Sequence, residues 1–445
     1  MRRGRRMPKR KKDESRLIDP TSIPRADTDK FLDKLSADLG GEGVMLQRAQ
    51  DMEGRLDLRR PCGIPSLDMA CGGGLPVGGL SQIDGPQSVG KNLLLNHYFA
   101  ENQRLHGENS NIFMMSLEYN YDKAFARACG VKVAFSPYEI RAQGRRFHQL
   151  GIELTEEEEE GLLEQTGKFH LFRGAASERL LEGVVEAVHL NAYQVGGIDS
   201  WDAMLTAADA DKDLEENAKV ADPANIQTRW MRKVQGALTA RPICPECFSR
   251  PLDHKNIKGR GTWYCPNKKD CGWSGPNPYP WENETTLIGI RQVRANLNRG
   301  TWGREYKVGG AWALKHGVLI DIQLRPGKSI KDKAGDKLAK EITWEIMKGK
   351  AGTHEGKKGT YTYYYTPPEV DVASDIVNYC IDKEIFVYEG KRWKLQHNGL
   401  LPGEDPMLFG SREAVQRAVE DGKEVQEALK LLMLQRAELG HIRYK

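Results

Sequence analysis

The chain has 445 residues with 66 Lys and Arg against 62 Asp and Glu, which gives a formal net charge of +4 at pH 7. This length predicts two to three domains with a large core, and no apolar run reaches the roughly 18 residues that a membrane span needs. The eight Cys residues do not suggest a secreted disulfide scaffold, which favours a reducing cytoplasm.

The first 12 residues carry all of the excess positive charge. They contain eight Lys or Arg and no acid, so the rest of the chain is slightly acidic. A secretory signal would require an apolar segment after these basic residues, and none follows. We interpret residues 1–25 as a disordered basic tail, which either contacts nucleic acid or another polyanion, or serves only as a solubilising arm.

The first predicted element is an amphipathic helix over residues 28–39. Its apolar side chains recur at helical spacing, and Gly40-Gly41 ends it; they are Phe31, Leu32, Leu35 and Leu39. A helix this short is marginal alone in water. We therefore expect the N-terminal element, residues 26–60, to dock on another surface.

The next segment has the pattern of a phosphate-binding loop. A short apolar run, 80–84, precedes it and a helix-like run begins at Leu93. Glycines let backbone N–H groups turn toward phosphate oxygens, and a Lys and a helix N-terminus add positive charge. The loop comprises Gly85, Pro86, Gln87, Ser88, Val89, Gly90, Lys91 and Asn92. Asn92 stands where a Mg²⁺-binding hydroxyl is usual, and its carbonyl oxygen is an acceptable Mg²⁺ ligand.

Apolar runs and helical segments alternate downstream of this loop. Strands are predicted at 112–117, 193–198, 285–290, 318–324 and 341–347, and a helix at 226–240. This alternation predicts an α/β fold with a mainly parallel sheet covered on both faces. After Pro367-Pro368 the composition becomes helical, at 372–379 and 411–439, which indicates a small C-terminal domain over 367–445.

Polar residues follow several of these strands. Glu118 ends the strand at 112–117, Asp199-Ser200 ends the one at 193–198, and Gln292 follows the one at 285–290. In an open parallel sheet, ligands bind beyond the carboxyl ends of the strands. Carboxylates there suit Mg²⁺ and orientation of an attacking water, and an amide suits contact with a γ-phosphate. We therefore predict that this chain binds a nucleoside triphosphate.

Four cysteines form a second strong pattern. Cys244 and Cys247 are followed, after 17 residues, by Cys265 and Cys271. Two close thiolate pairs at this spacing fit a tetrahedral structural Zn²⁺ site, and two disulfides are the less favoured alternative. We expect Trp263, Tyr264 and Trp273 to form the small core of a zinc ribbon at 241–280.

Basic and aromatic residues are interleaved just after Gln292. Cations that follow phosphates, mixed with rings that stack on bases, suit single-stranded nucleic acid; an ordinary flexible loop is the alternative. The candidate contacts are Arg294, Arg299, Trp302, Arg304, Tyr306, Lys307, Gly309 and Gly310.

Together these motifs resemble the RecA-type homologous-recombination ATPases, and the length and insertions resemble a phage-like member. The similarity runs from about Thr28 to the C-terminus, through the blocks 63–78, 85–92 and 117–126. It implies a RecA-like P-loop ATPase core over 61–366 with a twisted, mainly parallel sheet. An N-terminal helix, an inserted zinc ribbon and a small C-terminal α+β domain would complete the chain.

The resemblance also assigns roles. Glu118 would be the base that activates water, and Asp122 and Phe125 would flank the adenine. Asp199 matches the second acidic strand end, where an acid suits Mg²⁺. Gln292 would couple the γ-phosphate to the DNA-binding loop at 294–310, while Lys348 and Lys350 would reach the neighbouring subunit's ATP. The family's other DNA loop would fall at 206–225, which is acidic here.

The resulting hypothesis is an ATP-, Mg²⁺- and Zn²⁺-dependent recombinase of a bacterial or phage-infected cell. It would form a filament of its own copies on single-stranded DNA and pair that strand with homologous double-stranded DNA. Loading or single-strand-binding proteins are possible partners. The alternatives are a RecA-fold replicative helicase, a RadA-like branch-migration motor, and a DNA-binding scaffold without ATPase activity.

Overall fold

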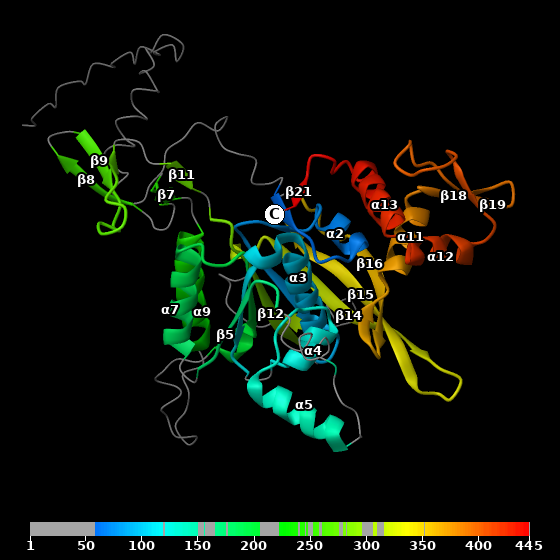
Figure 1. The fold of residues 1–445 in the computed structure, drawn as a ribbon, viewed down its shortest axis with the longest axis horizontal. Helices are drawn as coiled ribbons and strands as arrows, with labels where there is room; N and C mark the ends of the chain where they lie inside the picture. The colour runs from blue at the N-terminus through cyan, green and yellow to red at the C-terminus, as the bar shows by residue number, and fades with distance from the viewer. Residues whose placement is uncertain are drawn as a thin grey trace, which may run out of the picture. The chain divides into compact units, whose positions relative to one another are not determined.

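The fold was analysed in a computed structural model (Figure 1). The structure describes residues 58–118, 121–149, 155, 165–174, 177–204, 222–238, 241–244, 246–247, 252–257, 260–275, 279–281, 283–295, 306–308, 316–350 and 352–444. The predicted tail (1–25), the 28–39 helix and most of the acidic 206–225 segment lie outside them. Within the described residues, no helix has the length and apolarity that a membrane crossing requires.

A ten-stranded sheet forms the centre of the larger of two compact units. Its parallel strands, in spatial order, are β14 (Ile320–Lys331), β3 (Leu80–Gly85), β12 (Thr286–Ala295), β6 (Val195–Asp199), β4 (Asn111–Ser116) and β5 (Lys168–Phe172). Antiparallel strands extend the sheet beyond β14: β15 (Lys337–Gly349), β16 (Lys358–Tyr365) and β17 (Pro368–Val370). β13 (Tyr306–Val308) pairs antiparallel with β12. The sheet is therefore mixed, with a parallel block that runs from β14 to the edge strand β5 and an antiparallel block on the other side.

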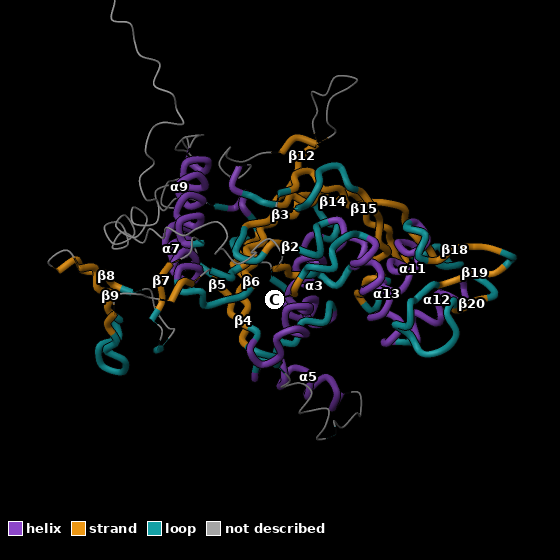
Figure 2. Tube along the Cα trace, turned by 90° about the horizontal axis from the view of Figure 1, so that it is seen from above, coloured by secondary structure: helices purple, strands orange, loops and turns teal. Residues whose placement is uncertain are grey.

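The two faces of this sheet bury different apolar clusters, because side chains alternate along a strand. Ile112 and Met114 pack with α3 (Lys91–His106) on one face. Phe113 and Met115 pack with α7 (Ser177–His189) and α9 (Asp222–Ala237) on the other. Figures 1 and 2 both show α7 and α9 side by side. The expectation that both faces are covered is thus confirmed.

Shorter elements surround the sheet. The 3₁₀ turn η4 (Gly107–Asn109) connects α3 to β4, α4 (Lys123–Ala128) and α5 (Pro137–Gln149) follow β4, and the 3₁₀ turn η5 (Trp201–Ala203) follows β6. Near the start of the described chain lie β1 (Leu58–Arg60), α2 (Pro65–Ala70) and β2 (Leu75–Pro76). β1 pairs with β2 and with the last strand, β21 (Arg443–Tyr444). This pairing attaches the final residues of the described chain to the core.

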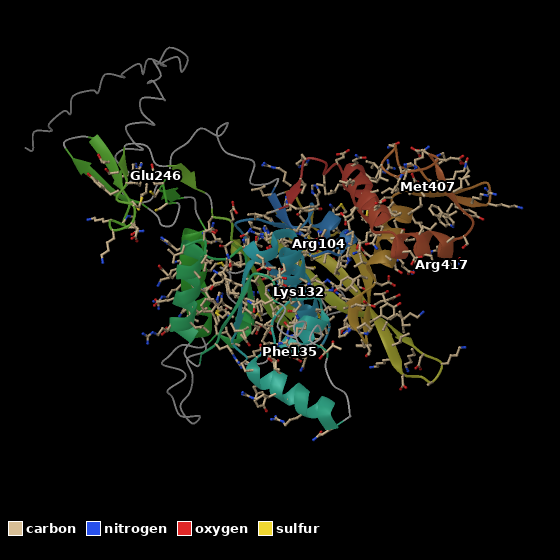
Figure 3. The ribbon with its side chains drawn as sticks, in the orientation of Figure 1. Arg104, Lys132, Phe135, Glu246, Met407 and Arg417 are labelled. Carbon is tan, nitrogen blue, oxygen red and sulfur yellow. The ribbon has the colours of Figure 1, made fainter. Side chains whose placement is uncertain are left out.

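The C-terminal region builds its own apolar cluster. It comprises α11 (Val372–Asp382), β18 (Phe386–Glu389), β19 (Arg392–Leu395), β20 (Met407–Phe409), α12 (Arg412–Asp421) and α13 (Lys423–Arg436). The helical stretch predicted at 411–439 is two helices, because Gly422 adopts an extended backbone between them. Met407 and Arg417 mark β20 and α12 in Figure 3. Met69 of α2 joins this cluster, so the region also packs on the core.

Residues 241–280 separate from the remainder as part of the second compact unit. β8 (Asp253–Ile257), β9 (Arg260–Tyr264) and β10 (Ser274–Gly275) form a three-stranded antiparallel sheet. β7 (Arg241–Ile243) pairs with β11 (Tyr279–Trp281) at the two ends of the segment. The small core contains Trp263 and Trp273 with the four cysteines and Leu252.

Candidate functional site

The predicted phosphate loop connects the end of β3 to the start of α3. Gly85 is tightly enclosed: a Cβ there would lie 2.9 Å from the carbonyl oxygen of Leu324. Gly90 has a φ of +116° and caps α3, and its Cβ would lie 2.8 Å from Ile342 Cδ1. Larger side chains at either position would displace the loop, so the two glycines are required by its shape.

Lys91 is the first residue of α3 and lies almost fully buried in the loop. Its Nζ donates to the carbonyl oxygens of Gly85 at 2.9 Å and Pro86 at 2.8 Å. Burial lowers the pKa of Lys91 from its ordinary value, while Asp199 and Glu118 oppose that change. The ammonium is therefore positioned over the loop, where it can bind a phosphate.

Asn92 and Asp199 meet beside Lys91. Asn92 Nδ2 donates to Asp199 Oδ2 at 3.1 Å, whereas the buried Oδ1 of Asn92 has no hydrogen-bond partner among the described residues. Burial raises the pKa of Asp199, and the hydrogen bond from Asn92 opposes that shift. An orphaned amide oxygen next to a carboxylate is the donor set that Mg²⁺ prefers. These two residues therefore fit the magnesium site predicted from the sequence.

Glu118 follows β4, and its carboxylate is fixed by a residue at the end of the neighbouring strand β6. Its Oε1 accepts a hydrogen bond of 2.5 Å from Ser200 Oγ, and Leu117 N donates to Asp199 O at 2.8 Å. β4 pairs with β6, so Ser116 lies opposite Asp199. The sheet register thus brings the two predicted acids to one edge.

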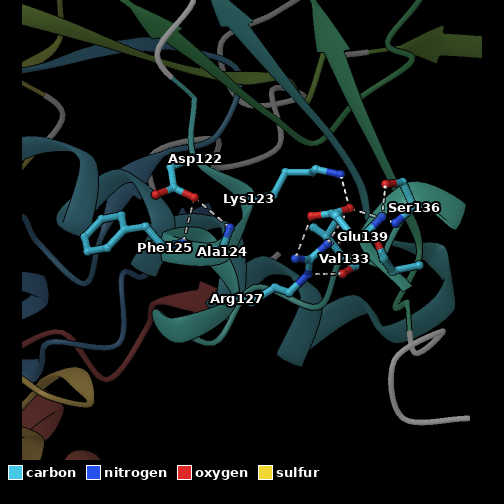
Figure 4. Close-up of polar contacts among 9 residues, drawn as sticks. Asp122, Lys123, Ala124, Phe125, Arg127, Val133, Ser136 and Glu139 are labelled. Atoms are coloured by element: carbon cyan, nitrogen blue, oxygen red, sulfur yellow. Dashed lines mark hydrogen bonds and ion pairs between the residues drawn. The ribbon is translucent and has the colours of Figure 1, made fainter. Parts of the chain in front are cut away.

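Asp122 and Phe125 lie at the start of α4 (Figure 4). Asp122 Oδ1 accepts from Ala124 N at 2.8 Å and Phe125 N at 3.1 Å, which caps the helix. Its Oδ2 takes no part in this cap and points away from it in Figure 4. An acceptor oxygen beside a half-buried ring suits an adenine, whose amino group is a donor.

A further ionic cluster fixes the segment that follows α4. Glu139 of α5 binds Lys123 at 2.5 Å and Arg127 at 3.2 Å. The Arg127 guanidinium lies 3.7 Å from the ring centroid of Phe135, which Figure 3 labels. Burial acts to raise the pKa of Glu139, but the hydrogen bonds from Lys123, Ser136 and Arg127 together pull it below its ordinary value. They hold α4 against α5 and so orient Asp122 and Phe125.

Gln292 lies directly opposite Gly85 in the pairing of β12 with β3. Its side chain is exposed, and its backbone N donates to Asp202 Oδ2 at 3.0 Å. One residue earlier, Arg291 lies opposite Asp84, and the two form a buried ion pair with an N–O distance of 3.4 Å. Burial and the neighbouring Asp321 raise the pKa of Asp84, while Arg291 opposes the shift.

Sequence reasoning did not find the ion pair of Asp84 and Arg291. The available signal was a charged residue at the end of each of two apolar strands. Only the register of the sheet shows that these strands are neighbours and that the positive Arg291 lies opposite the negative Asp84. The pair connects the strand before the phosphate loop with the strand before Gln292.

The predicted paired lysines lie at the end of β15. Lys348 is opposite Asp321 of β14, and its Nζ donates to His316 O at 3.2 Å. Burial and the neighbouring Lys350 lower the pKa of Lys348. Lys350 is exposed. Their predicted contact with a neighbouring subunit's ATP remains a prediction.

Part of the predicted DNA-binding segment is described. β12 and β13 form a hairpin in which Arg294 lies opposite Lys307, and Ala295 opposite Tyr306. Arg299, Trp302, Arg304, Gly309 and Gly310 lie outside the described residues. The hairpin extends from the strand that carries Gln292, so both share one backbone element.

The four predicted metal ligands converge. The Sγ atoms of Cys244, Cys247, Cys265 and Cys271 all lie within 4.8 Å of one another. Cys244 and Cys271 are 3.5 Å apart and Cys247 and Cys265 are 3.6 Å apart, whereas a disulfide needs about 2.05 Å. Glu246 N, in the turn that Figure 3 marks, donates to Cys244 Sγ at 3.4 Å. Thiolates at such spacings fit a tetrahedral ion with Zn–S bonds of about 2.3 Å.

Comparison with known proteins shows one recurring similarity, although no protein-family model matches the chain. Protein RecA of Ruminococcus albus is 24% identical over 315 residues, 70% of this chain and 58% of the relative. Protein RecA of Chloroflexus aggregans is 27% identical over 201 residues, 45% of this chain and 46% of the relative. The chloroplastic DNA repair protein recA homolog 1 of Arabidopsis thaliana is 45% identical over 71 residues, 16% of each chain.

The chain thus spans less than two thirds of the length of each of these three curated relatives. It is similar over much of its own length to proteins named RecA, and its mixed α/β fold with a large parallel-rich sheet is consistent with that similarity.

Proposed function

We propose that this chain is an ATP-dependent DNA recombinase, which assembles on single-stranded DNA and catalyses homologous pairing and strand exchange in recombination and repair. The observation that carries this proposal is the meeting of the phosphate loop, Glu118, Asp199 and Gln292 at one edge of the sheet. The similarity to proteins named RecA supports it. A phage-like RecA is the subtype we favour, acting in the cytoplasm of a bacterial or phage-infected cell.

In this proposal the phosphate loop and Lys91 bind the ATP phosphates. Asn92 and Asp199 would hold Mg²⁺, which supplies positive charge to the phosphate oxygens. Glu118 orients the attacking water and accepts its proton, and the hydrogen bond from Ser200 fixes that carboxylate. Asp122 accepts from the adenine amino group beside Phe125. Lys348 and Lys350 neutralise charge on ATP held by the adjoining copy.

Gln292 links hydrolysis to DNA. Its side chain is exposed at the level of Gly85, and the β12–β13 hairpin that continues from it carries Arg294, Tyr306 and Lys307. DNA bound to that hairpin would shift Gln292 toward the γ-phosphate. We therefore expect single-stranded DNA to stimulate ATP hydrolysis strongly, and Gln292→Ala to remove the stimulation without removing ATP binding.

Electron microscopy tests the assembly that this function requires. The protein is mixed with single-stranded DNA and a slowly hydrolysed ATP analogue, and strand exchange is measured in parallel with ATP. Extended helical filaments with strand-exchange activity are the expected result. Closed hexameric rings without strand exchange would move the assignment to a helicase or branch-migration motor, and equal ATPase rates with and without DNA would argue against the coupling.

We also propose that Cys244, Cys247, Cys265 and Cys271 hold one structural Zn²⁺. All four ligand positions are thiolates, so the site leaves no open position for catalysis. The ion would fix the turn at Glu246 and the β9–β10 pairing around Trp263. Elemental analysis of protein purified under reducing conditions tests this, and about one zinc per chain is expected.

A further inference from the structure

A lysine of the antiparallel part of the sheet contacts the phosphate loop from outside the set of predicted site residues. Lys340 of β15 donates from Nζ to the backbone oxygen of Ser88 at 2.8 Å. Ile342 lies two residues further along the same face of β15 and packs against Gly90. β15 therefore supports the phosphate loop at two points, near its tip and at the start of α3.

The contacted residue has an unusual backbone conformation. Ser88 has a φ of +59°, in the left-handed region that residues other than glycine seldom adopt. In this conformation the Ser88 carbonyl oxygen accepts a hydrogen bond from the Lys340 ammonium, and the backbone N–H groups of the loop stay available to phosphate. A hydrogen bond from a charged donor to a carbonyl oxygen is stronger than one from a neutral donor. The contact thus offsets the cost of the conformation that the loop needs.

The same ammonium lies near two aromatic rings. Lys340 Nζ is 5.7 Å from the ring centroid of Tyr363 and 5.8 Å from that of Tyr365, and these rings meet edge to face with centroids 5.4 Å apart. Such distances allow cation–π attraction. Tyr365 and Phe125 both pack on the edge of the same apolar cluster, and α4 lies against β17, which follows Tyr365. Lys340 thereby connects the phosphate loop with the aromatic side of the site.

Burial and the neighbouring Lys337 lower the pKa of Lys340, so desolvation of its charge opposes this placement. The carbonyl of Ser88 and the two tyrosine rings supply the compensating contacts. In contrast, Lys337 on the same strand is exposed. The two lysines differ in contact rather than in charge, which makes them a matched pair for mutation.

We propose that Lys340 is a positioning residue for the nucleotide: it holds the tip of the phosphate loop in its binding conformation and links the loop to the tyrosine pair. This inference rests on the proposed nucleotide site. Lys340 acts through Ser88 and touches no reacting atom. Its loss should weaken binding of the substrate in the ground state and of the transition state equally, which raises KM and leaves kcat unchanged.

The experiment compares the full-length wild type with Lys340→Met, Lys340→Arg and Lys337→Met. Binding of a non-hydrolysed ATP analogue is measured by calorimetry without DNA, and KM and kcat for ATP are measured with DNA. Lys340→Met keeps the apolar stem, so we expect about tenfold weaker binding and a matching rise in KM at constant kcat. Lys340→Arg should recover most of the affinity, and Lys337→Met should match the wild type.

Wild-type affinity in a folded Lys340→Met protein would overturn the proposal, as would a fall in kcat at constant KM. Thermal unfolding of each variant separates loss of the loop contact from loss of the fold. If the wild type itself binds no ATP analogue, the proposed function fails instead, and the two failures are thereby distinguished.

Discussion

The candidate nucleotide site and the cysteine cluster are assembled in different ways. The first takes side chains from four strand ends, between residues 85 and 292, and joins them through the register of β3, β12, β6 and β4. The second takes four cysteines from residues 244–271, and its apolar cluster has four buried members among the described residues. The first therefore depends on a large core, whereas the second has little to hold it together apart from its ligands.

The two sites therefore obtain their rigidity from different sources. Asp199 and Glu118 follow buried strands, Asn92 of α3 donates to Asp199, and Ser200 donates to Glu118, so the packing and hydrogen bonds of the protein itself hold this arrangement. Four thiolates near one another repel when ionised and attract when they share a cation. We expect the ribbon to fold with its metal and the nucleotide site to fold without one.

Removal of zinc should have the largest effect. Structural Zn²⁺ in small domains contributes about 10–16 kcal/mol of apparent binding free energy, so Cys244→Ser should unfold the 241–280 segment. ATP binding should persist, since that segment and the predicted nucleotide site belong to different compact units. Limited proteolysis of the segment, elemental analysis and nucleotide binding check this on one sample.

Cys129→Ser is the matched control, because Cys129 is buried in the core and lies outside the cluster. It should keep the metal and the protease resistance of the ribbon. If Cys244→Ser removed ATP binding as strongly as zinc, the separation of the two sites would be wrong.

Glu118→Gln should have the next largest effect, and only on the sheet-edge site. Gln keeps an oxygen that can accept from Ser200, so the local geometry survives while the base is lost. We expect ATP turnover to fall by at least about 100-fold with nucleotide binding nearly unchanged. Single-turnover kinetics and calorimetry measure the two quantities separately, and zinc content should not change.

These two sites also differ in how far the sequence predicted them. The cysteine spacing predicted that four Sγ atoms would converge, because all four cysteines lie within one short segment. Trp263 and Trp273 were correctly expected in its core, whereas Tyr264 is not a member of the cluster. Short-range patterns of this kind need no knowledge of the wider fold.

At the sheet edge, the sequence predicted each strand end but not which strands are neighbours. It therefore found Gly85 and Gln292 separately and missed the buried pair of Asp84 and Arg291. It also missed β16 and the contact of Lys340 with Ser88, because a lysine on a charged hairpin looks like a solvated residue. Lys340 and Ser88 are 252 residues apart in the sequence, so their hydrogen bond depends on the tertiary fold.

A smaller effect should come from the contact between the core and the C-terminal region. Asp375 is buried and accepts from Ser66 N at 2.8 Å and Ser66 Oγ at 2.5 Å. Burial raises the pKa of Asp375 to about 6, so the folded state binds this proton more tightly than the unfolded state. The resulting stability is present below the unfolded pKa of about 4 and is lost as pH rises to about 6.

Asp375→Asn mimics the protonated acid, so it should remove this part of the pH dependence. Above pH 6 the variant should be more stable than the wild type by on the order of 2–3 kcal/mol at most. Chemical denaturation from pH 5 to pH 7.5 measures the difference in unfolding free energy. An unchanged slope in the variant would show that Asp375 does not titrate in this window, and the ribbon should be unaffected either way.

Asn92→Thr should have the smallest effect and the most local one. A Thr hydroxyl offers Mg²⁺ a compact oxygen, whereas the Asn carbonyl is one heavy atom longer and Mg²⁺ tolerates little departure from octahedral geometry at about 2.1 Å. Lys91, the loop amides and Asp199 stay in place, so ATP binding should survive. DNA-dependent ATP hydrolysis should rise several-fold, which corresponds to about 1 kcal/mol of barrier.

Asn92→Leu sharpens this test, because it keeps the size of the side chain and removes both the donor to Asp199 and the buried Oδ1. It should weaken Mg²⁺ binding at the site, so that a higher Mg²⁺ concentration than in the wild type is needed for the half-maximal rate of ATP hydrolysis. A Mg²⁺ titration of the three proteins then ranks Thr, Asn and Leu by their ability to hold the ion. If Asn92→Thr instead abolished ATP binding, the assignment of residues 85–92 as a phosphate-binding loop would have to be abandoned.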